Sequence, residues 1–122
     1  MNTPARPASV RPSRGEIWQV NLSPSVGRET NKVRPALILS VNALNHGPAE
    51  LVIVVPISTV DKGIATHVRV RSGEGGQTED AFIKCEEVKS ISTERLVRKR
   101  GTAHPATLAK AIDTVKILLG IP

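Results

Sequence analysis

The chain has 122 residues, a net charge of +6 and a sequence pI near 10.1. This length predicts one domain, and the basic balance favours a polyanionic partner such as nucleic acid or an acidic protein segment. Tyrosine is absent, and Trp18 and Phe82 are the only aromatic residues. This composition argues against RNA modules that read bases by stacking them on exposed aromatic rings.

The cysteine and histidine content predicts neither a disulfide nor a metal site. Cys85 is the single cysteine, so no internal disulfide can form, and its apolar surroundings favour a buried residue over a nucleophile. His46, His67 and His104 are scattered without ligand-type spacing, so neither a metal nor another cofactor is expected. No apolar run could span a membrane and no secretion signal is evident, which together predict a cytoplasmic protein with no membrane partner.

The first half of the chain predicts a basic tail followed by three strands. Residues 1–13 contain Pro4, Pro7 and Pro12 and predict a flexible tail ahead of a single domain over residues 14–122. The elements then expected are a half-buried strand over 16–22, a long loop over 23–33, a buried strand over 36–41, a turn region over 42–49 and a central strand over 51–57. Pro56 cannot donate to a ladder, which predicts that pairing breaks there or that this strand lies at an edge.

The second half predicts three more strands and a closing helix. The expected elements are a loop over 60–65, a strand over 67–71 with Val68 and Val70 inward and His67 outward, a mobile Gly-rich loop over 72–79, a long bent strand over 80–91, a strand over 96–101, and a helix that begins near Pro105 and ends at Gly120. Leu108, Ala111, Ile112, Val115 and Leu119 share one face of that helix. About six short antiparallel strands with one helix indicate a mainly β fold, a partly open barrel.

A polar loop ends in Arg34-Pro35, directly before the apolar run Ala36–Leu39. Pro35 biases Arg34 toward extended geometry, and a guanidinium offers a rigid fork of donors that suits a phosphate. An arginine held at a strand entrance therefore predicts a phosphate-binding or phosphate-reacting site. The structural alternative is that Arg34 caps loop carbonyls or pairs with Glu29.

Four segments together resemble the MazF/PemK family of toxins, which are messenger-RNA endonucleases. They are Arg14–Trp18, the loop with Gly27, Glu29 and Arg34-Pro35, the stretch Val55–Thr59 followed by Lys62-Gly63, and Glu87–Ile91. The resemblance covers about residues 14–120 and implies an SH3-like barrel shared with CcdB-type toxins. It also implies a homodimer, a single-stranded RNA substrate, cleavage without metal, and inhibition by an antitoxin with an acidic, disordered tail.

The resemblance also assigns site residues. The family's catalytic arginine falls on Arg34, and its catalytic hydroxyl, usually a threonine, falls on Ser58, with Thr59 as the alternative donor. Glu29 falls on a loop glutamate that contacts RNA and has a possible catalytic role. Further RNA contacts are expected at Gly27, Arg28, Thr30, Lys62, Glu86 and Glu87. The second glutamate differs from the glutamine of some members.

The residues themselves favour a reaction that uses the substrate's own nucleophile. With no histidine pair and no metal cluster, the RNA 2′-OH is the simplest attacking group, since it lies beside the phosphorus and needs only orientation. Arg34 would then stabilise the charge that develops on the phosphate, and Ser58 would hold the phosphate or the attacking hydroxyl. The products expected are a 2′,3′-cyclic phosphate and a 5′-hydroxyl.

Two other functions remain open on the sequence. A CcdB-like gyrase-binding toxin would share the barrel without catalysis, although the ending Leu118–Pro122 lacks the tryptophan that those proteins place near their C-terminus. An inactive relative that only binds RNA or protein is the third possibility, and the serine at position 58 keeps it open.

Overall fold

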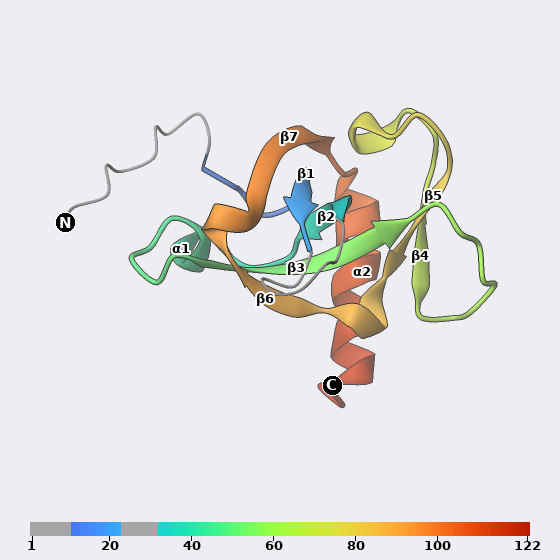
Figure 1. The fold of residues 1–122 in the computed structure, drawn as a ribbon. Helices are drawn as coiled ribbons and strands as arrows, with labels where there is room; N and C mark the ends of the chain where they lie inside the picture. The colour runs from blue at the N-terminus through green and yellow to red at the C-terminus, as the bar shows by residue number, and fades with distance from the viewer. Residues whose placement is uncertain (1–10, 23–31) are drawn as a thin grey trace.

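The computed structural model describes residues 11–22 and 32–122, which form a strongly bent sheet with a helix packed along one side (Figure 1). The strands in these ranges are β1 (Glu16–Asn21), β2 (Val33–Ile38), β3 (Leu51–Ser58), β4 (His67–Val70), β5 (Ala81–Lys84), β6 (Lys89–Ser92) and β7 (Leu96–Thr102). The helices are α1 (Asn42–Asn45) and α2 (Pro105–Leu118), and three 3₁₀ turns are η2 (Glu74–Gly76), η3 (Cys85–Glu87) and η4 (Thr93–Arg95).

The seven strands of the described residues form one antiparallel sheet in the order β4-β5-β3-β2-β1-β7, with β6 paired to β3. The prediction of a mainly β, antiparallel, partly open fold is confirmed. The prediction of one long strand over 80–91 is wrong, because η3 divides it into β5 and β6. The predicted turn region after β2 contains the single helical turn α1.

Pro56 lies where β3 changes partners along one edge. Residues 51–54 of β3 pair with β6, whereas Ile57 and Ser58 pair with β5. The predicted break in pairing is therefore confirmed, but the edge-strand alternative is wrong, because β2 pairs with the other side of β3. Proline has no N–H to donate to a neighbouring strand. The missing donor is tolerated at Pro56 because β3 is between two partner strands at this point of the edge.

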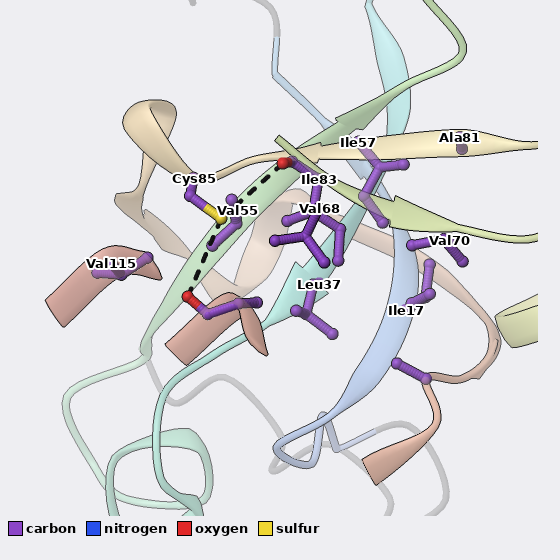
Figure 2. Close-up of a cluster of buried hydrophobic side chains, with 12 residues drawn as sticks. Ile17, Leu37, Val55, Ile57, Val68, Val70, Ala81, Ile83, Cys85 and Val115 are labelled. Atoms are coloured by element: carbon purple, nitrogen blue, oxygen red, sulfur yellow. Dashed lines mark hydrogen bonds between the residues drawn. The ribbon is translucent and has the colours of Figure 1, made fainter. Parts of the chain in front are cut away.

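The sheet is buried on both faces, and α2 covers one of them. The cluster between the sheet and α2 is drawn in Figure 2 and includes Ile17, Leu37, Val55, Val68 and Val115. Cys85 is fully buried among them, with Sγ 3.9 Å from the carbonyl oxygens of Ile83 and Ala111. Burial raises the pKa of the Cys85 thiol to about 11, so the expectation of a structural cysteine is confirmed.

The second cluster lies on the face of the sheet opposite the first cluster. It consists of Trp18, Val20, Ala36, Ile38, Val52, Val54, Ile91 and Leu96, contributed by β1, β2, β3, β6 and β7. The predicted core position of Trp18 is confirmed, at 3% exposed. The expectation that β1 is half-buried is wrong, because its neighbour Ile17 points into the other cluster.

The Gly-rich segment 72–79, expected as a mobile loop, packs against the body of the protein instead. Glu74 is 6% exposed, and its Oε2 accepts a 2.9 Å hydrogen bond from the backbone N–H of His104, the residue before α2. Gly76 has φ +79° and lies against the backbone of Arg100 on β7. The segment therefore anchors both β7 and the beginning of α2.

The closing helix begins at Pro105, as predicted. Ala111 and Val115 are buried and Leu108 packs against the first cluster. Leu119, expected on the same buried face, is 63% exposed. The reason is that α2 ends at Leu118 and Gly120 then takes a left-handed conformation at φ +71°, which turns the chain away from the core.

Candidate active site

Arg34 and Ser58 lie at neighbouring ends of β2 and β3. The two strands pair in register with Ala36 opposite Pro56 and Ile38 opposite Val54. Two residues beyond the last pair of this ladder, Arg34 stands on β2 and Ser58 at the end of β3. Leu37 and Ile57 point into the cluster under α2, so by strand alternation the side chains of Arg34 and Ser58 lie on the opposite face of the sheet. The predicted arginine and hydroxyl, from separate segments of the chain, therefore lie on one face at the same end of the two strands.

Arg34 and Ser58 belong to a longer line of residues that crosses the sheet. Arg34 pairs with Val20 on β1, Ser58 pairs with Phe82 on β5, and Phe82 pairs with Arg69 on β4. We call these five residues, from β1 to β4, the cross-strand row. The row places two arginines, a hydroxyl and an aromatic ring on one face. This is a favourable surface for a nucleic acid strand.

The side chain of Arg34 is exposed near the start of β2. Within the described residues its hydrogen bond is from Nη1 to the backbone oxygen of the adjacent Val33, at 3.3 Å. The remaining donors of the fork are therefore oriented by the strand rather than by an acidic partner in the described part of the chain. A guanidinium in this state can bind two oxygens of one phosphate.

The hydroxyl of Ser58 is positioned by a local turn. Its Oγ accepts a 3.1 Å hydrogen bond from the backbone N–H of Val60, which leaves its own proton to be donated. Thr59 lies in the bend beyond the end of β3 and is exposed. Lys62 is exposed in the next loop, whose predicted turn forms when Asp61 Oδ1 accepts from the N–H of Gly63 at 2.9 Å.

A hydrogen-bonded carboxylate lies beside the row at η3. Oε1 of Glu86 accepts from the hydroxyl of Thr66 at 2.7 Å, and Oε2 accepts from Nε2 of His67 at 2.9 Å. Burial alone would raise the pKa of Glu86, but the hydrogen bonds from Thr66 and His67 outweigh it and lower the pKa to about 2. Glu86 is therefore an ionised, preoriented acceptor at neutral pH.

The imidazole of His67 is buried, with its side chain 3% exposed, so of the two expectations for this outward-facing histidine, solvent-exposed or interfacial, the solvent-exposed one is wrong. The strand alternation was interpreted correctly, since Val68 and Val70 are buried on the other face. The error came from assuming that the outer face is open to solvent, whereas η3 covers the start of β4 there. Nδ1 of His67 is buried and has no hydrogen-bond partner among the described residues.

Glu87 is held by a different partner from the neighbouring strand. Its Oε2 lies 3.3 Å from Nζ of Lys84, and Lys84 lies opposite His67 in the pairing of β4 with β5. The two predicted glutamates thus occur side by side, each with its own partner from the outer strands. Thr66 was missed in the sequence because its contact depends on η3 folding back over the start of β4, whereas Lys84 is three residues from Glu87 and was missed because the 3₁₀ turn between them was expected to be a strand.

The remaining predicted contacts, Gly27, Arg28, Glu29 and Thr30, lie outside the described residues, and so does most of the expected loop over 23–33. Among residues 11–22 and 32–122, no group of three or more His, Cys, Asp or Glu side chains is arranged to hold a metal ion. In the same ranges, no helix is long and apolar enough to cross a bilayer.

The fold and the row define a small basic β protein with an arginine and a hydroxyl at adjoining strand ends, and the same class appears among known proteins. Residues 13–119 match the family described as PemK-like, MazF-like toxin of type II toxin–antitoxin system. The chain is 35% identical over 113 residues to Endoribonuclease MazF9 of Mycobacterium tuberculosis, an alignment that covers 88% of this chain and 96% of that protein. The chain belongs to the PemK-like, MazF-like toxin family.

Two solved structures agree with this membership. The crystal structure of MazF from Deinococcus radiodurans superposes with a TM-score of 0.77 at 25% identity, covering 90% of this chain and 97% of that one. An endoribonuclease in complex with its cognate antitoxin, from a mycobacterial species, gives a TM-score of 0.71 at 24% identity and covers 92% and 96%. These matches do not favour the CcdB-like gyrase-binding alternative.

Proposed function

We propose that this protein is the toxin of a toxin–antitoxin pair and that it cleaves single-stranded RNA, with messenger RNA as the target. The position of Arg34 and Ser58 at the same end of β2 and β3, in a chain 35% identical to an endoribonuclease, supports this most directly. Cleavage of messenger RNA arrests translation and growth. The site of action is the cytoplasm, where messenger RNA is translated.

The chemistry uses the 2′-OH of the substrate as nucleophile. The 2′-oxygen attacks the adjacent phosphorus, the bond to the 5′-oxygen of the next nucleotide breaks, and the products are a 2′,3′-cyclic phosphate and a 5′-hydroxyl. The fork of Arg34 binds the non-bridging oxygens and stabilises the charge that grows on them. The Ser58 hydroxyl donates to the phosphate or orients the attacking hydroxyl, because its oxygen is already held by Val60.

Substrate binding involves the surroundings of this pair. Lys62 supplies positive charge from the loop after β3, and Glu86 and Glu87 accept hydrogen bonds from base edges while Thr66, His67 and Lys84 keep them in place. The contacts expected at Gly27, Arg28, Glu29 and Thr30 belong to the same proposal, with Glu29 also a candidate for proton transfer and Thr59 the alternative hydroxyl.

The partners proposed are a second copy of this chain and a cognate antitoxin with an acidic, disordered tail. The solved mycobacterial endoribonuclease is in complex with its cognate antitoxin. The net charge of +6 complements an acidic segment as well as RNA, so the antitoxin and the substrate compete for overlapping basic surface.

The decisive experiment compares three versions of one RNA oligonucleotide that contains a mapped cleavage site. The unmodified strand should be cut to a cyclic phosphate and a 5′-hydroxyl, whereas strands with 2′-O-methyl or 2′-deoxy ribose at the scissile position should remain intact. Excess EDTA should leave the cleavage rate unchanged. Cutting of the 2′-O-methyl strand at the same position would contradict the proposed mechanism.

A further inference from the structure

Phe82 is an aromatic residue in an unusual place for a fold so poor in aromatics. It is the only phenylalanine of the chain, yet among the described residues it belongs to neither of the two buried clusters. It is partly exposed on β5. A core-forming phenylalanine would be expected inside one of these clusters, so its position calls for another explanation.

The register of the sheet places Phe82 next to the reacting groups. It lies directly opposite Ser58, and Ser58 is the residue that separates it from Arg34 in the cross-strand row. Neighbouring strands are about 4.8 Å apart, so the backbone of Phe82 lies roughly 5 Å from that of Ser58. A nucleotide adjoining the phosphate held by Arg34 would have its base within reach of this ring.

The next residue of the cross-strand row is an arginine, whose positive charge suits the phosphate of such a nucleotide. Arg69 lies opposite Phe82 on β4, and its guanidinium is held by the carboxylate of Asp80. Asp80 in turn accepts from the backbone N–H of Ser72 at 2.9 Å. The guanidinium is thus fixed beside the ring, with side-chain exposure of 53%, where it can contact the phosphate that follows the stacked base.

We propose that Phe82 stacks one unpaired base of the RNA, next to the scissile phosphate, and that Arg69 contacts the phosphate beyond it. This inference rests on the proposed endoribonuclease activity and extends its substrate path from Arg34 and Ser58 across β5 to β4. The low aromatic content argued against RNA modules that read bases by stacking them on exposed aromatic rings, and the position of Phe82 makes one such stack the exception. Stacking tolerates every base, so Phe82 contributes affinity and positioning while Glu86 and Glu87 contribute base selection.

The first test replaces the ring and measures kcat/KM on the unmodified oligonucleotide. Phe82→Ala should lower kcat/KM by about 5- to 150-fold, the range expected for loss of one base–aromatic stack. Phe82→Tyr should retain most of the activity and Phe82→Leu should not, because leucine keeps the apolar bulk without the flat face. Val97→Ala, at an apolar residue 54% exposed on β7 at the other end of the strand order, is the matched control and should have no effect.

The second test identifies the base by removing it. Abasic nucleotides are introduced one at a time around the scissile position. At one of these positions the wild-type enzyme and Phe82→Ala should have equally low cleavage rates, because the base that stacks on the ring is then missing. Arg69→Gln should weaken binding of the 2′-O-methyl strand and lower the slope of log Kd against log salt by about one.

Three outcomes would overturn the inference. The first is full activity of Phe82→Leu, and the second is a Phe82→Ala defect that is undiminished at every abasic position. The third is a shift of Phe82→Ala to a smaller species on size-exclusion chromatography, because this would place the ring between two copies of the chain. If Phe82→Ala does not fold, the kcat/KM values of Phe82→Leu and Phe82→Tyr test the inference instead. Failure of the wild-type protein to cut RNA would instead contradict the proposed function, so the two failures are distinguishable.

Discussion

Nε2 of His67 donates a 2.9 Å hydrogen bond to Oε2 of Glu86, from an imidazole that is 3% exposed to a carboxylate that is 36% exposed. A carboxylate can only accept, so this contact requires the proton on Nε2. The bond joins the start of β4 to η3 and aims the other oxygen of Glu86 at Thr66. It makes Glu86 both a structural link and an oriented acceptor beside the cross-strand row.

The low pKa of Glu86 predicts a specific acid sensitivity. Its pKa is about 2 in the folded protein and 4.5 in the reference state, so its stabilising contribution is complete above pH 4.5 and is lost as the pH falls toward 2. Glu86→Gln should lower the free energy of unfolding at pH 7 by no more than about 1 kcal/mol, since the group is partly solvated. Urea denaturation at pH 7, 4 and 2.5 should show this difference shrinking with acid, while exposed Glu79→Gln serves as control. A difference that is constant over this range would contradict the assignment.

Removal of the fork at Arg34 should abolish catalysis without affecting the fold. Arg34→Ala should lower kcat by at least about 10²-fold, as for loss of a transition-state donor, and Arg34→Lys should restore little because it lacks the fork. Stability should change by less than about 0.5 kcal/mol, because the side chain is exposed. Thermal melting and RNA cleavage measured on the same preparations check both statements, with exposed Arg98→Ala on β7 as control. An active Arg34→Ala protein would remove the central residue of the proposed site.

The position of the catalytic hydroxyl can be tested with a pair of neighbouring variants. Ser58 is the last residue of β3 and its oxygen is held by Val60, whereas Thr59 lies in the bend beyond the strand, so Ser58→Ala should slow cleavage by about 10²- to 10³-fold and Thr59→Ala should remain near wild type. Ser58→Thr should retain activity, because the hydroxyl is kept. Single-turnover rates on one oligonucleotide provide the comparison. The reverse pattern, with only Thr59→Ala impaired, would mean that the chain leaves β3 with a different orientation from the one described.

The packing of the Gly-rich segment predicts two very different glycine substitutions. A Cβ on Gly76, at φ +79°, would collide with the backbone carbonyl of Arg100, whereas a Cβ on Gly73, at φ +94°, would meet nothing within 4 Å. Gly73→Ala should therefore cost only the backbone strain, about 1–2 kcal/mol. Gly76→Ala should cost about 1–3 kcal/mol more through overpacking.

Chemical denaturation of both glycine variants gives the comparison, and their cleavage rates per folded molecule should match wild type because neither Gly73 nor Gly76 is among the residues of the proposed site. Equal losses of stability would indicate that this segment does not press against β7.

The strands were largely predictable because their local chemistry is explicit. The apolar, β-branched run of β3 and the alternation of Val68 and Val70 are determined by residues a few positions apart, and Pro105 marks the beginning of α2. The predictions that were wrong concern residues whose burial or pairing depends on a segment that is distant in the sequence. His67 is covered by η3, Ile17 is covered by the first cluster, and the 80–91 strand is broken so that β6 can reach the first half of β3.

The sequence by itself determined the mainly β class, the basic charge, the buried cysteine and the identity of Arg34 and Ser58 as candidates, because propensity, charge and residue chemistry are local properties. Only the tertiary structure brought Arg34 and Ser58 to the same end of β2 and β3, set Phe82 opposite both Ser58 and Arg69, and gave Glu86 its two donors. Strand register decides which residues meet, and register depends on how all the strands pack together rather than on any one segment of the chain.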